Sequence, residues 1–124
     1  MSPLPGTASE ADKRFVAAIY ADFNAREIDR LLALMIPDVE WPNGMEGGFE
    51  QGREAVRAYW TRQWGLIDPQ VTPLQVDAEP DGRLAVRVRQ VIRGLAGATL
   101  RSGEVLHTYT LAGGQVRRMD IGEA

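Results

Sequence analysis

The sequence predicts one α+β domain in which helices come first and an antiparallel meander follows. Apolar residues recur at helical spacing through the first half and alternate at strand spacing through the second, where turn signals separate the strands. Helices segregated from consecutive strands are typical of α+β folds rather than of alternating strand–helix units. The 124 residues suffice for one domain, which we expect over residues 9–124, after a flexible terminus at residues 1–8.

Two helices are predicted before the first strand. Overlapping capping boxes, Thr7 to Glu10 and Ser9 to Asp12, offer two starting points for the first helix. The second should end at Ile36-Pro37, because the residue before proline avoids helical dihedral angles. Its apolar stripe has the spacing i, i+3, i+4 and i+7, and consists of Ile28, Leu31, Leu32 and Met35.

A short strand at Val39–Trp41 is expected next, followed by a mobile glycine-rich loop over residues 43–52. A third helix is predicted from about Arg53 to Trp64. One face of this helix should point inward, and it carries Val56, Tyr59, Trp60, Gln63 and Trp64.

Four strands are predicted over residues 71–79, 83–93, 99–112 and 115–121, the third of them bulged at Ser102-Gly103. In the strand 83–93, alternation places Gln90 on the inner face among apolar residues. The opposite face carries four arginines, which we interpret as a solvated or dimer-forming surface paired with Asp77 and Glu79: Arg83, Arg87, Arg89 and Arg93.

Composition excludes several classes of function. The net charge of −3 gives no general attraction for nucleic acid or anionic lipid, so we expect neither as a partner. A single histidine and the absence of cysteine argue against a metal site, and no nucleotide-binding motif is present, so we expect no cofactor. No apolar run is long enough to span a bilayer and the chain start lacks a secretory signal, which predicts a cytoplasmic protein.

Four segments resemble the SnoaL-like and ketosteroid-isomerase-like proteins of the nuclear transport factor 2-like superfamily, over about residues 10–121. The segments are Ile19–Asn24 leading into Glu27–Leu32, Pro37–Trp41, Gly52–Trp60, and Glu104–Tyr109 with Gly113–Val116. The resemblance implies a cone, in which a strongly curved antiparallel sheet wraps around three helices and opens at one end to an apolar pocket. It also makes a homodimer through the sheet face the expected assembly.

The same resemblance points to candidate catalytic positions. In ketosteroid isomerases a tyrosine of the first helix and a protonated aspartate on a late strand form an oxyanion hole, while a carboxylate on the first strand shuttles the proton. Tyr20 falls near the tyrosine position, His107 falls at the late aspartate, and Trp41 replaces the shuttle carboxylate. Ketosteroid isomerase chemistry is therefore not expected.

His107 is the main candidate for acid/base catalysis, since alternation points it inward and histidine titrates near neutral pH. The alternative is a buried, hydrogen-bonded histidine that only shapes the pocket. Tyr20 either polarises a substrate oxygen or is a satisfied core tyrosine. Gln90, as a buried amide, needs a partner, either His107 or a ligand. The alternative is that a bulge places Gln90 outward or at the pocket mouth.

Large side chains are candidates for holding a flat ligand, and their alternative role is to fill the core. The residues expected to bind substrate are Trp41, Tyr59, Trp60, Gln90, Tyr109 and Met119. Three functions follow from these residues. The first is binding of a small hydrophobic or aromatic molecule, the second is an isomerase, cyclase or dehydratase that uses His107 and Tyr20, and the third is a dimeric interaction module.

Overall fold

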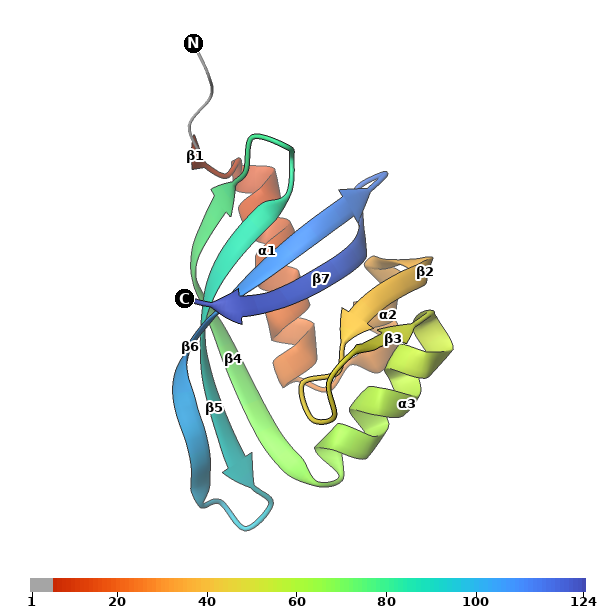
Figure 1. Ribbon diagram of the computed structural model, residues 1–124, viewed down its shortest axis with the longest axis vertical. Helices are drawn as coiled ribbons and strands as arrows, with labels where there is room; N and C mark the ends of the chain where they lie inside the picture. Colours follow the sequence, from red (N-terminus) through yellow and green to blue (C-terminus); the bar gives the residue numbers. More distant parts are fainter. Residues whose placement is uncertain (1–5) are drawn as a thin grey trace.

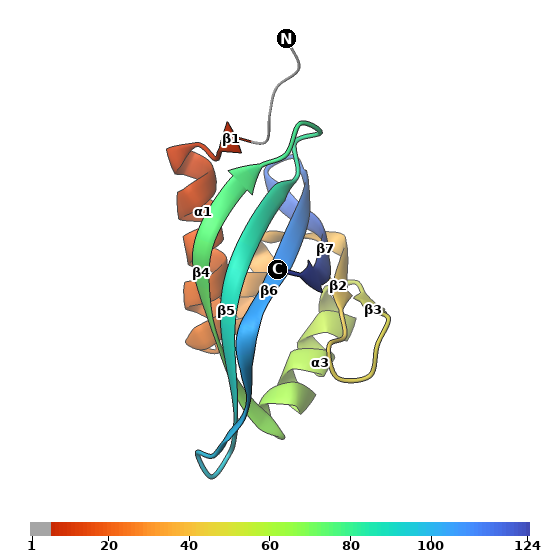
Figure 2. The ribbon, with the colours of Figure 1, turned by 60° about the vertical axis from the view of Figure 1, so that its left-hand side comes forward.

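The computed structural model describes residues 6–124. In this part of the chain, seven strands form one curved sheet, and three helices lie on its concave side (Figures 1 and 2). The elements are β1 (Gly6–Thr7), α1 (Glu10–Asn24), α2 (Ile28–Ala33), β2 (Met35–Pro42), β3 (Phe49–Gln51), α3 (Arg53–Trp64), β4 (Ile67–Ala78), β5 (Leu84–Gly94), β6 (Thr99–Ala112) and β7 (Gln115–Glu123). The α+β fold with a curved sheet around three helices is confirmed.

A two-residue strand precedes the domain start expected at residue 9. Gly6 and Thr7 pair with Ala78 and Asp77 at the edge of β4, and the side chain of Ala8 is buried. Residues 1–5 of the terminus expected to be flexible lie outside the described residues. Of the two capping boxes, Ser9 provides the cap, since its hydroxyl accepts a hydrogen bond from the Asp12 amide at 3.0 Å.

The second helix is shorter than predicted, because it ends at Ala33 and Met35 already begins β2. The carbonyl of Leu34 accepts a hydrogen bond from the Val116 amide at 2.8 Å, and that of Met35 accepts bonds from the Arg53 side chain. These partners satisfy the carbonyls in an extended conformation. Met35 remains fully buried, so its apolar pattern fitted either structure.

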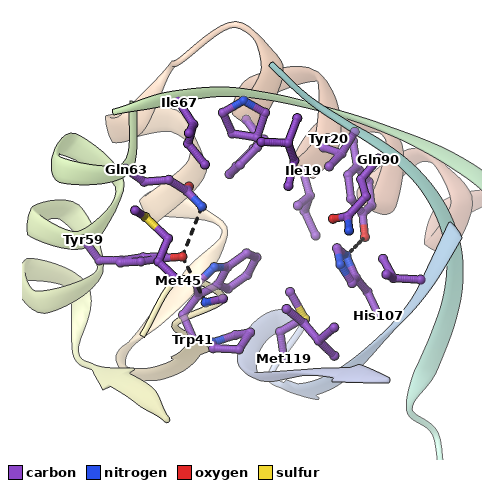
Figure 3. Close-up of a pocket in the computed structure, with 18 of the residues that line it drawn as sticks. Ile19, Tyr20, Trp41, Met45, Tyr59, Gln63, Ile67, Gln90, His107 and Met119 are labelled. Atoms are coloured by element: carbon purple, nitrogen blue, oxygen red, sulfur yellow. Dashed lines mark hydrogen bonds between the residues drawn. The ribbon is translucent and has the colours of Figure 1, made fainter. Parts of the chain in front are cut away.

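The strands follow the order β1-β4-β5-β6-β7-β2-β3. The expected antiparallel arrangement applies to every pair except β2 and β7, which run parallel. This pairing joins the end of the meander to the short segment between the helices and brings Trp41 and Met119 to the same region of the molecule (Figure 3).

The segment 43–52, expected to be a mobile loop, instead holds a tight turn and β3. The side chain of Asn43 accepts hydrogen bonds from the amides of Met45 and Glu46 at 3.0 and 2.8 Å, which fixes the turn. The following strand then pairs with β2, with Gln51 opposite Glu40.

The predicted bulge at Ser102-Gly103 is wrong. Ser102 and Gly103 pair regularly with Val91 and Gln90, and the irregularity between β5 and β6 lies at Ile92 and Arg93, next to the hairpin turn. A second irregularity lies at Thr110 and Leu111, between β6 and β7. Strand β6 therefore keeps one alternation from Arg101 to Tyr109.

The outer face of the sheet carries the arginines as predicted, but with different acidic neighbours. Arg83 pairs with Asp81 at 2.8 Å and Arg87 approaches Glu104 at 4.0 Å, in place of the expected Asp77 and Glu79. An acid in the turn before Arg83 and one on the adjacent strand β6 are the partners instead. No helix in the described chain is long and apolar enough to cross a membrane.

Candidate functional site

A cavity of about 230 Å³ lies between the concave side of the sheet and the helices. Its wall combines side chains from α1, the end of β2, the turn after it, α3 and strands β4 to β7 (Figure 3). Most of the wall is apolar, with contributions from Ile19, Phe23, Ile67, Val71, Ile92 and Met119. The expected pocket at the open end of the cone is therefore present.

Three polar side chains form a hydrogen-bonded chain in one wall of this cavity. The hydroxyl of Tyr109 donates to that of Tyr20 at 2.8 Å. The Tyr20 hydroxyl in turn lies 2.7 Å from Nδ1 of His107 (Figure 3). All three residues are buried, so each group depends on these bonds rather than on water. The rings of Tyr20 and His107 are nearly parallel, at 17° with centroids 5.9 Å apart.

The direction of this chain favours one tautomer of His107. Because the Tyr20 oxygen accepts the proton of Tyr109, its own proton is free to bond Nδ1 of His107. Nδ1 is then an acceptor, and the single proton of a neutral imidazole resides on Nε2. The arrangement leaves Nε2–H as the donor that His107 can offer to a ligand oxygen.

Burial keeps all three groups uncharged at neutral pH. It lowers the pKa of His107 to about 4. Burial also raises the pKa of Tyr20 and of Tyr109, and for Tyr20 the neighbouring Tyr109 adds to the rise. The chain thus consists of two neutral phenols and a neutral imidazole.

A second polar group lies on the α3 side of the cavity. The Tyr59 hydroxyl accepts hydrogen bonds from the Gly44 amide at 3.0 Å and from Nε2 of Gln63 at 3.1 Å. Burial raises the pKa of Tyr59, so this phenol also remains protonated. Its proton is therefore available near the turn that follows β2.

The structure places the sequence-predicted site residues as follows. The cavity wall includes His107, Tyr20, Trp41, Tyr59, Gln90, Tyr109 and Met119. Trp60 is the exception, since it is fully buried in the core and does not line the cavity. Its ring packs edge-on against Trp41 and Phe23 and stacks on Trp64, because its position on α3 points it behind the cavity wall.

Gln90 lines the cavity but makes no side-chain hydrogen bond to His107, one of the two partners considered for it, among the hydrogen bonds of the described residues. The Nδ1 nitrogen of His107 is hydrogen-bonded to the Tyr20 hydroxyl instead. The amide of Gln90 therefore remains available in the cavity.

No carboxylate belongs to the cavity wall within residues 6–124. Glu40 pairs with Arg118 at 2.8 Å, and Glu46 pairs with Arg62 at 3.1 Å. The same residues contain no cluster of histidine, aspartate and glutamate that could hold a metal ion. Proton transfer by an acidic side chain is thus not supported by this wall.

The cavity residues that sequence reasoning did not assign to the site include Arg101, Gln63 and Met45. Arg101 could have been found by counting back from His107 in steps of two along β6, had no bulge been assumed. Gln63 was assigned to the inner face of its helix but not to the site. Met45 had no local signal, since its position depends on the turn fixed by Asn43.

Comparison with known proteins agrees with this architecture. A family model of the SnoaL-like domain matches residues 16–119. TerC, co-crystallised with polyporic acid, is 26% identical, with a TM-score of 0.77 over 91% of each chain. A nuclear transport factor 2-like protein of unknown function from Burkholderia pseudomallei is 20% identical, with a TM-score of 0.79 over 94% of this chain and 92% of that chain.

A Mycobacterium tuberculosis protein in complex with estradiol-17β-hemisuccinate is 22% identical, with a TM-score of 0.71 over 86% of this chain and 88% of that chain. None of the curated protein sequences matches significantly. The family match covers most of the described chain. The chain therefore belongs to the family of SnoaL-like domains, and it has the fold of the nuclear transport factor 2-like protein.

Proposed function

We propose that the protein binds a small hydrophobic or aromatic molecule in this cavity. The observation that carries the proposal is the buried chain Tyr109–Tyr20–His107, which ends in one unused donor within an apolar wall. Apolar pockets with a few convergent polar groups are the usual form of small-molecule sites.

The volume limits the size of the ligand. About 230 Å³ lies below the range of about 300–1,000 Å³ that is typical for drug-sized ligands. We therefore expect one or two rings inside the cavity, with any further part extending through its mouth. The ring of Trp41 is held by Trp60 at 5.4 Å and Tyr109 at 6.3 Å between centroids, so this wall is already arranged for a flat molecule.

Two of the similar structures support a small-molecule ligand, since TerC was crystallised with polyporic acid and the mycobacterial protein with estradiol-17β-hemisuccinate. Both molecules contain rings and oxygen atoms. In this chain we assign the oxygen contact to Nε2–H of His107.

The alternative function is an isomerase, cyclase or dehydratase in which His107 exchanges a proton and Tyr20 polarises a substrate oxygen. The Tyr20 hydroxyl is engaged by both Tyr109 and His107, which leaves it no free proton for a substrate. A base role at Nε2 would require the opposite tautomer. We therefore rank binding ahead of catalysis, with His107 as the donor to the bound oxygen.

A homodimer through the outer sheet face and a cytoplasmic location are also proposals, and so is the third function, recruitment of a protein by that dimer. Arg87 and Glu104 place both signs of charge on the outer face, which a two-fold interface can pair between copies. The absence of a general positive charge supports partners other than nucleic acid.

The test of the main proposal uses two probes of equal shape. We would measure binding of 2-acetylnaphthalene and of 2-isopropenylnaphthalene, in which a CH₂ group replaces the carbonyl oxygen, by isothermal titration calorimetry. The wild type should prefer the ketone by about fivefold, the value of one neutral hydrogen bond. His107→Phe should lose this preference.

Thr108→Ala is the matched control, because Thr108 is adjacent to His107 on β6 and points to the opposite face of the sheet. It should retain the ketone preference. Failure of both probes to bind the wild type would contradict the proposed function. Equal binding of both probes would keep the pocket and remove the role of His107.

A further inference from the structure

We propose that the ligand is an acid, and that Arg101 at the mouth of the cavity binds its anionic group. This inference rests on the proposed function and adds the chemical class of the ligand, which is a ring system bearing a carboxylate or an acidic hydroxyl. The apolar body would occupy the cavity with its oxygen at His107, and the charge would remain at the mouth.

The register of β6 places Arg101 on the inner face of the sheet. Arg101 is paired with Ile92, Gly103 with Gln90, and Val105 with Val88, so these residues continue the alternation that points His107 inward. Arg101 accordingly lines the cavity. It differs in this respect from Arg87 and Arg89, which point to the outer face.

Charge singles out Arg101 within the cavity wall. Among the described lining residues it is the one charged side chain, and the others are apolar or neutral. Several other arginines are engaged by acids, as in the pairs Arg26–Asp68, Arg62–Glu46 and Arg118–Glu40. Within residues 6–124 no carboxylate lies within 4.0 Å of Arg101, so its guanidinium is available for an anion from outside the chain.

The spacing along β6 separates the two polar contacts of the ligand. His107 and Arg101 are six residues apart, or roughly 20 Å between their Cα atoms at about 3.3 Å per residue, and the length of the Arg101 side chain can shorten this span. Of the two inner-face residues between them, Val105 lines the cavity, whereas Gly103 contributes no side chain and a Cβ there would meet no atom within 4 Å. The inner wall is therefore open at Gly103, next to Arg101 along the strand.

Exposure of Arg101 makes this arrangement favourable for an acid. A carboxylate buried beside His107 would lose its hydration, whereas one at the mouth keeps part of it. A guanidinium also binds a carboxylate through two parallel hydrogen bonds, which orients the ligand. The neutral His107 then contacts an uncharged oxygen, and Arg101 contacts the charged one.

The experiment compares acids with their amides, which have nearly the same shape and no charge. The probes are 2-naphthoate, 2-naphthylacetate and 4-(2-naphthyl)butanoate, each with its carboxamide, so that the acid is carried at three distances from the rings. Calorimetry at low salt should show at least one acid binding about tenfold more tightly than its amide, as expected for a charge-assisted bidentate contact. Added salt should reduce this ratio.

Arg101→Gln should bring the acid-to-amide ratio close to one. Arg101→Lys, which keeps the charge without the bidentate geometry, should retain part of the preference. Arg89→Gln is the matched control, since it removes the same charge from the outer face of the neighbouring strand. It should behave as the wild type does.

The outcomes separate this inference from the proposed function. Amides that bind without any preference for the acids, or a preference that survives in Arg101→Gln, would overturn the role of Arg101 and leave the binding function intact. Binding of none of the six probes would contradict the binding function and this inference together.

Discussion

The protonation state of His107 decides which chemistry the cavity supports. A histidine exposed to water is half protonated near pH 6.5, whereas burial lowers the pKa of His107 to about 4. Tyr20 then holds the ring through Nδ1 and leaves Nε2–H for a ligand. The same residue type that suggested acid/base catalysis in the sequence is thus arranged as a neutral donor.

Nuclear magnetic resonance can test this directly, because His107 is the sole histidine of the chain. Two-bond ¹⁵N–¹H spectra at pH 7 should show the Nε2–H tautomer, and the ring resonances should titrate with a midpoint near 4. Tyr20→Phe removes the donor to Nδ1, so the variant should populate both tautomers. A wild-type midpoint near 6.5 would contradict the buried, neutral histidine.

Stability should depend on pH through the same residue. Between pH 6.5 and 4 the unfolded chain binds a proton at this histidine and the folded chain does not, so the free energy of unfolding falls as the pH falls. From pH 7 to pH 5 the loss from His107 is about 2 kcal/mol. Urea unfolding of wild type and His107→Gln at both pH values isolates this contribution, since other groups titrate equally in both proteins.

A wild-type protein that loses no more stability than His107→Gln between these pH values would contradict the lowered pKa of His107.

The sequence could predict that His107 points inward, because strand alternation is a local property. It could not predict its partner, since Tyr20 lies 87 residues away and the contact depends on how α1 packs against the sheet.

Strand β6 shows how an assumed bulge changes the set of residues that are predicted to line the site. A bulge reverses the alternation on one side of it, so the assumed bulge at Ser102-Gly103 left the side of Arg101 undetermined. The observed irregularity lies at the hairpin end, between Ile92 and Arg93. Regular pairing through Gly103 is what brings Arg101 to the inner face.

Gly103 offers a test of this register. Gly103→Val should fold with unchanged or higher thermal stability, because valine favours strands and its Cβ meets no atom within 4 Å. Its side chain should project into the cavity beside Gln90 and weaken binding of 2-acetylnaphthalene, measured by calorimetry. Gly122→Val is the matched control, since Gly122 pairs with Leu106 on the outer face and also has open space around its Cβ.

Equal ligand affinity in the two glycine variants would show that Gly103 does not border the binding space.

The end of α2 shows another case in which the sequence pattern fits two structures. An unbroken apolar stripe extended the predicted helix to Met35. Burial of Met35 is the same in a helix or a strand, and only the hydrogen bonds from Val116 and Arg53 decide between them.

The whole molecule combines elements that local sequence patterns predict with one strand pairing, β2 with β7, that no local pattern predicts. The helices and the meander of β4 to β7 could be predicted, because the spacing of their apolar residues and the turn residues between them indicate each element. The parallel pairing of β2 with β7 could not, because parallel strands are distant in sequence and no turn marks them. That pairing completes the cavity wall near Trp41 and Met119.

The proposed homodimer makes a prediction about the outer face of this sheet. Sedimentation velocity should show a wild-type dimer, and Arg87→Glu should dissociate it, because the new carboxylate faces Glu104 in both copies of a two-fold interface. Arg30→Glu on α2 makes the same charge change away from the sheet and should leave the dimer intact.

The proposed interface lies on the outer face of the sheet, opposite the cavity, so the monomeric Arg87→Glu variant should still bind 2-acetylnaphthalene with wild-type affinity. A wild-type monomer at all concentrations would contradict the dimer, and a dimer that persists in Arg87→Glu would place the interface elsewhere. Loss of binding upon dissociation would instead mean that the neighbouring copy supports the site.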